Sequence, residues 1–333
     1  MKIAAISLTT CIAICLALAA ATPRPATAQP VVRLDVEGGA KYIAGDNTME
    51  IGGKVVRADG SRTTVGFPVS RLEFPVDAFT ATAKARADYG SRWSFILEGG
   101  RSITDTERKM KDSDWIYGDF GNPGSRDSYS ESSVDMDVWL LDTRVRYKIA
   151  EMRHGAGMQA TERLISFTKY SFFASMGFMF QDYTYEVSEV TQYSLSNPGQ
   201  TPVFDSGVGL EYNLTYYVPY TELGFGINHK DRFHLEASIG GTLFAHAEDK
   251  AEHVRRGVIS KMDSNWDGDM LMGNATARYN FTDNIYCTLS LEGRRIFVED
   301  KSVTYEPGSQ VHTIEEELTG RNSSVSTSFG YRF

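Results

Sequence analysis

The sequence is poor in cysteine, which excludes a fold stabilised by disulfide bonds. It has three cysteines, and Cys11 and Cys15 both lie in an apolar N-terminal run. The remainder of the chain has only Cys287, and a single cysteine cannot form an internal disulfide. The stability of the fold must therefore come from packing and backbone hydrogen bonds.

Long apolar runs are also missing beyond the N-terminus. One such run, Ile3 to Ala21, follows the positive charge of Lys2 and precedes the small residues Ala26-Thr27-Ala28. This order predicts a secretory signal peptide at 1–28, which leaves 29–333 as a single exported domain. After it, no stretch approaches the ~18 consecutive apolar residues of a membrane helix.

An excess of positive charge is absent as well. The chain has 34 basic and 43 acidic residues, for a formal charge of −9. Removing the signal peptide takes away Lys2 and Arg24 and brings the charge to −11. Such a protein has no electrostatic reason to bind nucleic acid, whereas basic peptides and cationic surfaces are natural partners.

What the sequence does have is alternation. From Val325 to Phe333 the odd positions are apolar, aromatic or Thr, the even positions are small or polar, and the chain stops on an aromatic residue. One apolar face and one polar face are typical of a transmembrane β-strand. About ten segments resemble this one. They lie near 31–43, 70–89, 92–103, 135–149, 165–185, 210–227, 232–246, 270–281, 285–298 and 324–333.

The connections between these segments are of two kinds. Tight turns occur at 89–91, 228–231 and 282–284. They alternate with long polar stretches at 44–69, 104–134, 186–209, 247–269 and 299–323. Short turns on one side and long loops on the other are the asymmetry of outer-membrane barrels. The sequence therefore predicts an all-β fold: a ten-stranded antiparallel transmembrane β-barrel with long extracellular loops.

Two aspartates in the second long polar stretch could support chemistry. Asp112 and Asp114 flank Ser113 and precede Trp115. In an extended chain such residues share a face with Cα atoms about 6–7 Å apart, so both carboxylates can converge on one water. Continuing the alternation of 93–97 places both on the interior face. The spacing alone also fits a solvated acidic loop.

Several short motifs resemble the omptins, a family of ten-stranded outer-membrane proteases of Gram-negative bacteria. Besides Asp112-Ser113-Asp114-Trp115 they are Asn122-Pro123-Gly124, Trp139-Leu140-Leu141, Val218-Pro219-Tyr220 and Ala251-Glu252-His253. The resemblance implies an endopeptidase at the extracellular rim, with an aspartate pair facing an aspartate–histidine pair and water between them. Asp112 and Asp114 match the first pair, and His253 matches the histidine.

The chain departs from the family pattern at one catalytic position. Ala251 stands where the family has the aspartate that orients the histidine. Asp249 lies about 13 Å along a strand from His253, and Glu252 points to the opposite face of a regular strand. Continuing the alternation of 233–243 would also turn His253 towards lipid, so we expect a bulge or the end of the strand before it.

The resemblance further implies acidic groups that bind basic side chains of the substrate, which we assign to Asp249 and Glu50. Substrates would be basic peptides or surface proteins. Omptins also require lipopolysaccharide, held by arginines, but the comparable positions here carry Thr184 and Thr215. We therefore expect a monomer in outer-membrane lipid with no cofactor, lipopolysaccharide remaining an open activator. We expect no metal site, since 265–269 lacks the length and closing glutamate of a calcium loop.

Three hypotheses follow for the function. The first is an omptin-like aspartate–histidine endopeptidase that cleaves next to basic residues. The second, motivated by Ala251, is a catalytically inactive barrel that acts as an adhesin or surface-binding protein. The third is a passive channel, which charge pairs between residues such as Arg144, Arg146 and Glu236 would obstruct.

Overall fold

The computed structural model describes residues 32–106, 108–115, 126–154, 168–196, 199–307 and 309–333. The predicted signal peptide and the motif at 122–124 lie outside these residues. Within them, no helix has the length and hydropathy needed to span a membrane.

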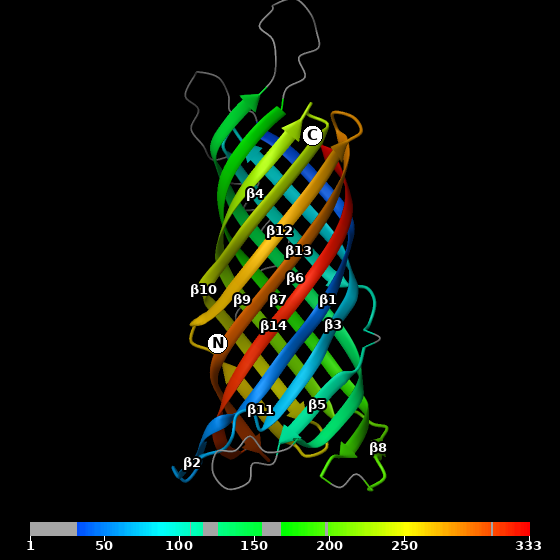
Figure 1. Cartoon of the computed structure of the whole chain (residues 1–333), viewed down its shortest axis with the longest axis vertical. Helices are drawn as coiled ribbons and strands as arrows, with labels where there is room; N and C mark the ends of the chain where they lie inside the picture. Colours follow the sequence, from blue (N-terminus) through cyan, green and yellow to red (C-terminus); the bar gives the residue numbers. More distant parts are fainter. Residues whose placement is uncertain (1–31, 107, 116–125, 155–167, 197–198, 308) are drawn as a thin grey trace, which may run out of the picture.

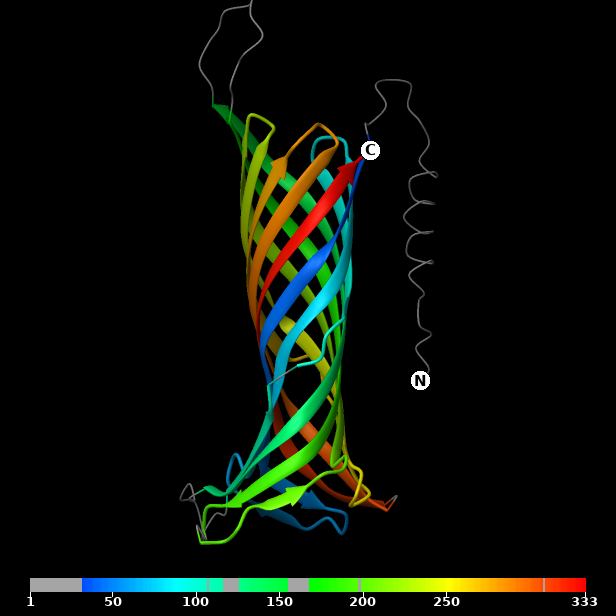
Figure 2. The same cartoon turned by 90° about the vertical axis from the view of Figure 1, so that its right-hand side faces the viewer.

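A closed antiparallel barrel forms the body of the molecule (Figure 1, Figure 2). In the described part of the chain, ten long strands close it, each pairing with its neighbours until β14 meets β1. These strands are β1 (Val32–Arg57), β3 (Ser70–Tyr89), β4 (Trp93–Ser102), β6 (Arg126–His154), β7 (Thr168–Ser194), β9 (Leu210–His229), β10 (Phe233–His253), β12 (Gly268–Asn280), β13 (Ile285–Glu306) and β14 (Ser309–Arg332). The predicted fold class is confirmed.

Four short strands lie at one end of the barrel, opposite the end that holds the C-terminus (Figure 1). They are β2 (Arg62–Thr64), β5 (Met110–Trp115), β8 (Val203–Asp205) and β11 (Val258–Asp263). We call this end the mouth. Here β5 continues the position of β4 between β3 and β6, and β11 continues that of β12 between β10 and β13.

The boundaries of the strands differ from those expected. Large parts of the five stretches predicted as loops are strand, because β1 runs to Arg57, β7 to Ser194 and β10 to His253. Beyond the lipid the outer face meets water, while apolar side chains such as Met136, Tyr185 and Leu214 face inward, so the alternation continues with its polarity reversed. A search for strands with an apolar outer face therefore reports the membrane-embedded part alone.

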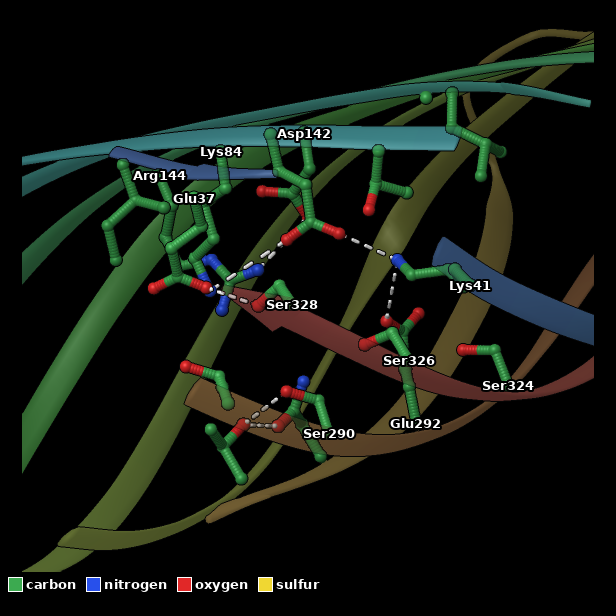
Figure 3. A pocket seen from close by; sticks show the side chains of 18 of the residues that line it. Glu37, Lys41, Lys84, Asp142, Arg144, Ser290, Glu292, Ser324, Ser326 and Ser328 are labelled. Carbon is green, nitrogen blue, oxygen red and sulfur yellow. Dashed lines mark hydrogen bonds and ion pairs between the residues drawn. The ribbon is translucent and has the colours of Figure 1, made fainter. Parts of the chain in front are cut away.

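Inside the membrane section, charged and hydroxylated side chains fill the lumen (Figure 3). The cavity among these side chains has about 100 Å³, which is room for a few waters. Lys41 Nζ lies 2.7 Å from Glu98 and 3.8 Å from Glu292, and Arg146 lies 2.7 Å from Glu236. The opposite charges pair across the barrel as the sequence predicted.

An aromatic layer, formed by Phe74, Tyr183, Tyr185, Tyr212 and Tyr216, closes the lumen below the mouth. All five side chains are at most 1% exposed. Phe74 of β3 stacks on Tyr212 of β9 at 4.3 Å between ring centroids, although several strands separate them in the barrel wall. The contact therefore spans the lumen. This layer disfavours a passive channel and forms the aromatic floor of the mouth, that is, its boundary with the membrane section of the lumen.

Candidate active site

The carboxylates of Asp112 and Asp114 face the interior of the mouth. Strand β5 pairs Asp112 with Leu72 and Asp114 with Ser70 on β3, and its other edge pairs with β6. Met110, on the same face of β5, packs into the buried core. Since residues two apart share a face, Asp112 and Asp114 point inward, as the alternation of 93–97 predicted.

Asp112 is the more perturbed of the two acids. Burial and the negative charge of Asp114 raise its pKa to about 7, while a hydrogen bond with Ser70 and the charge of Arg256 oppose that rise. Its Oδ1 is buried without a hydrogen-bond partner among the described residues. By contrast, Asp114 Oδ2 accepts a hydrogen bond from Ser128 at 2.9 Å. An orphaned carboxylate oxygen of this kind is suited to hold a water.

A bulge in β10 turns His253 inward. The pairing of β10 with β9 shifts by one residue between Gly241 and His246 of β10. Its pairing with β12 shifts in the same way between Thr242 and Ala245 of β10. Before the bulge the even residues face the lumen, and after it the odd residues do: Ala245, Ala247, Asp249 and Ala251 are all buried. The extra residue corrects the register so that the last odd residue of the strand, His253, faces the mouth.

The tight turn after His253 brings a cation into the site. Arg256 N and Gly257 N both donate to the carbonyl oxygen of His253 at 3.0 Å, and Gly257 has a left-handed φ of 63°. Burial and the charge of Arg256 lower the pKa of His253, whereas the charge of Asp114 raises it. The charges of Asp114 and Arg256 thus act on both Asp112 and His253. The three residues predicted to be catalytic therefore face the same mouth.

No hydrogen bond to the imidazole ring of His253 occurs among the described residues. Ala251 is 2% exposed and offers none. Glu252 lies on the outer face and pairs with Lys250 at 2.7 Å. Asp249 is occupied by Tyr212 Oη at 3.0 Å and by Met262 N at 3.0 Å. Neither acid therefore replaces the missing aspartate as the partner of the histidine.

Asp249 forms a buried carboxyl pair with Glu316 of β14. Burial raises the pKa of Asp249, while its hydrogen bond from Glu316 opposes this. Burial, the charge of Asp249 and the same hydrogen bond raise the pKa of Glu316 well above its usual range. Both groups therefore hold their protons more strongly than ordinary carboxyl groups do, within the mouth and next to the aromatic layer.

Glu50 lies elsewhere. It alternates with Met49, which is buried in the core, so the Glu50 carboxylate lies on the outer face of β1. There it accepts a hydrogen bond from Arg71 Nε at 2.6 Å. The structure does not bring Glu50 to Asp249 or to the catalytic candidates.

Two mouth residues were not singled out from the sequence, Arg256 and Glu316. Glu316 is the middle of three consecutive glutamates, which read as a solvated charge run. Arg256 lies in a turn, and its place depends on the bulge in β10. Glu316 could have been found by extending the alternation of the C-terminal strand backwards through 309–332, because its even-numbered residues face the interior.

Comparisons with known proteins identify the family and the fold. A model of the Omptin family matches residues 64–333. The outer membrane protease OmpT from Escherichia coli superposes with a TM-score of 0.72 at 14% identity, covering 90% of this chain and 97% of that chain. The outer membrane protein OprG from Pseudomonas aeruginosa gives a TM-score of 0.35 at 9% identity, covering 92% and 97%. No curated protein sequence matches this chain.

Proposed function

Because the chain belongs to the omptin family of Gram-negative outer-membrane barrels, we propose that it is an endopeptidase whose Asp112, Asp114 and His253 activate water. The observation that carries the proposal is the convergence of these three side chains in a mouth with an aromatic floor. The enzyme acts as a monomer in outer-membrane lipid, and its substrates are basic peptides or surface proteins.

Water bound between the two aspartates and His253 is the nucleophile. The unpartnered Oδ1 of Asp112 accepts one of its protons, and Asp114, fixed by Ser128, holds the neighbouring position. The pKa of Asp112, about 7, allows it to take a proton from water near neutral pH and to return it to the leaving amine. His253, whose pKa is lowered, is neutral at that pH and is free to accept the second hydrogen bond of the water.

The arrangement replaces one element of the family scheme. In place of an aspartate that stabilises an imidazolium, Arg256 favours the neutral imidazole. The guanidinium, which also acts on Asp112, can stabilise the negative charge that develops on the carbonyl oxygen during attack. The aspartate pair then does most of the proton transfer, and His253 positions the water.

Specificity for basic residues rests on the Asp249–Glu316 pair rather than on Glu50. The pair lies within the mouth, while Glu50 is already paired with Arg71 on the outer face. A guanidinium or ammonium group that reaches this pair would favour the ionised carboxylates, and the released proton would pass to solvent. The acidic balance of the whole chain favours the same substrates.

The test is cleavage of a fluorogenic Arg-Arg peptide by refolded wild type, the Ala251→Asp variant and the His253→Ala variant, with and without lipopolysaccharide. We expect activity in the wild type and a gain in Ala251→Asp, since a carboxylate two residues before His253 can orient the ring. A wild type as inactive as His253→Ala under both lipid conditions would refute the proposal. If cleavage requires lipopolysaccharide, residues other than Thr184 and Thr215 must bind it.

A second function is favoured by Ala251 alone. Without the orienting carboxylate, the same barrel could act as a catalytically inactive adhesin that binds a host surface through its extended mouth. Wild type would then be inactive with the Arg-Arg peptide, Ala251→Asp would gain cleavage, and binding of a matrix component would be unchanged in Asp112→Ala.

A further inference from the structure

Three potential metal ligands meet on the outer face of the barrel, away from the proposed catalytic groups. His246 and Glu248 are two residues apart on β10 just after its bulge, and therefore share a face. Asp263 of β11 is the direct cross-strand partner of Glu248. The Nε2 atom of His246 lies 3.4 Å from Glu248 Oε1 and 3.6 Å from Asp263 Oδ1.

The protonation of His246 is constrained from its other side. Its Nδ1 lies 2.7 Å from the carbonyl oxygen of Ser264, and a carbonyl can only accept, so Nδ1 carries the hydrogen. When the ring is neutral, the lone pair of Nε2 therefore faces the two carboxylates. A hydrogen bond from one ring nitrogen to a backbone carbonyl is the usual way in which metal-binding histidines are oriented.

The two carboxylates lie opposite each other on neighbouring strands. Like charges directly opposite each other on neighbouring strands destabilise a sheet. Lys250, next along the outer face, lies 2.7 Å from Glu252, and no lysine or arginine of the described residues forms an ion pair with Glu248 or Asp263. His246 itself is 94% buried, since its side chain is 6% exposed. Two carboxylates and the Nε2 atom of a neutral His246 ring thus converge on a point where a cation would bind favourably.

We propose that His246, Glu248 and Asp263 form a zinc site on the outer face of the barrel. Tetrahedral zinc with bonds of about 2.0–2.2 Å places its ligand atoms about 3.3–3.6 Å apart. The distances of 3.4 Å and 3.6 Å from Nε2 match this, and the ligand atoms of all three residues lie within 4.8 Å of one another. One histidine and two carboxylates leave the fourth position to water.

Aromatic rings form the wall of this site. The Trp266 ring stacks on the His246 imidazole at 4.7 Å and 12°, and Tyr217 lies 5.5 Å away. Trp266 holds a left-handed φ of 60°, which is uncommon for a residue with a large side chain. An apolar shell of this kind shields the metal and fixes its ligand. Zinc bound here would fasten β10 to β11, the hairpin that carries His253.

The site can be tested by measuring zinc binding to the refolded full-length barrel. All proteins would carry His253→Ala, so that the mouth cannot contribute a histidine ligand. Equilibrium dialysis against ZnCl₂ with metal analysis would compare this parent with the added substitutions His246→Ala and Asp263→Asn. The side chain of Asp263 is 81% exposed, so its replacement leaves the fold intact. Glu299→Gln, in a neighbouring acidic group of the outer face, is the matched control.

The parent and the Glu299→Gln control should bind one zinc ion with equal affinity. Asp263→Asn should weaken binding by at least about 10-fold, and His246→Ala by more. Zinc should also change the tryptophan fluorescence of the parent, and Trp266→Phe should remove that change without removing the zinc. Equal binding by the parent and by both ligand variants would overturn the proposal, as would a parent that binds no zinc.

Discussion

The membrane section of the lumen and the mouth are built from the same kinds of residue, yet they treat charge in opposite ways. In the membrane section the acids mostly meet bases, as Glu98 meets Lys41. In the mouth acids meet acids: Asp112 lies beside Asp114, and Asp249 beside Glu316. Paired charges hold a structure, whereas acids forced together acquire raised pKa values and can exchange protons. The comparison separates the scaffold from the chemistry.

The largest expected effect would come from breaking a pair in the membrane section. Lys41 is buried, and Lys41→Met would leave Lys84, 3.9 Å away, as the only ion-pair partner of Glu98 in the described part of the chain. Removing one partner of a buried pair costs about 3–5 kcal/mol in the free energy of unfolding. Urea unfolding, followed by the loss of the folded band in unheated gels, would measure it.

The matched control is Lys54→Met at the mouth. Lys54 also faces a glutamate, Glu315, at 3.5 Å, but its side chain is 77% exposed. Exposed pairs contribute about 0–1 kcal/mol, so this variant should unfold like the wild type. Equal losses in the two variants would contradict the distinction between the two regions.

A smaller effect is expected on substrate preference. Asp249→Asn should raise KM for an Arg-Arg peptide by about 10–100-fold, because a hydrogen bond to a charged group is worth about 1.5–3 kcal/mol. Glu50→Gln should change it less than about 2-fold, since Arg71 already occupies that carboxylate. Steady-state kinetics on Arg-Arg and Ala-Ala peptides would compare them. A larger loss in Glu50→Gln would restore Glu50 to the specificity site.

The pH profile sharpens the comparison further. Cleavage should rise as pH increases through about 7, because Asp112 must lose its proton to act as a base. The charge of Asp114 is one cause of the raised pKa of Asp112. Asp114→Asn should therefore shift the rise in cleavage rate to lower pH, and it should also slow the reaction. Rates measured from pH 5 to 9 would show it. If the rise occurred at the same pH in Asp114→Asn as in the wild type, a group other than Asp112 would control the pH profile.

The same pKa has a consequence for stability. The folded protein binds the proton of Asp112 more tightly than the unfolded chain, so this group favours folding less as pH rises from the usual aspartate range through about 7. Asp112→Asn should therefore be more stable than the wild type at pH 8, and the difference should shrink at pH 4. Urea midpoints at the two pH values would reveal it.

The sequence allowed the barrel and the identity of the catalytic candidates to be predicted, but not the details of the mouth. Lipid imposes alternation, so strands such as 285–298 were visible. Above the lipid that constraint is lost, and the long extensions of β1, β7 and β10 were read as loops. The inward orientation of His253 depends on a bulge in β10. The alternation of 233–243 predicted that such a bulge was needed but not where it lies. Glu316 and Arg256 depend on strand pairing across the mouth, which no local pattern encodes.

The most direct test of the central claim is cleavage of the Arg-Arg peptide by wild type, Asp112→Asn and Asp135→Asn at pH 8. Asp135 is exposed on β6 and serves as the matched control. Wild type and Asp135→Asn should cleave equally, while Asp112→Asn, of the same size but unable to accept the proton, should lose about 10²–10⁴-fold in rate. Cleavage by Asp112→Asn at the wild-type rate would contradict the claim that the acids of the mouth activate the water.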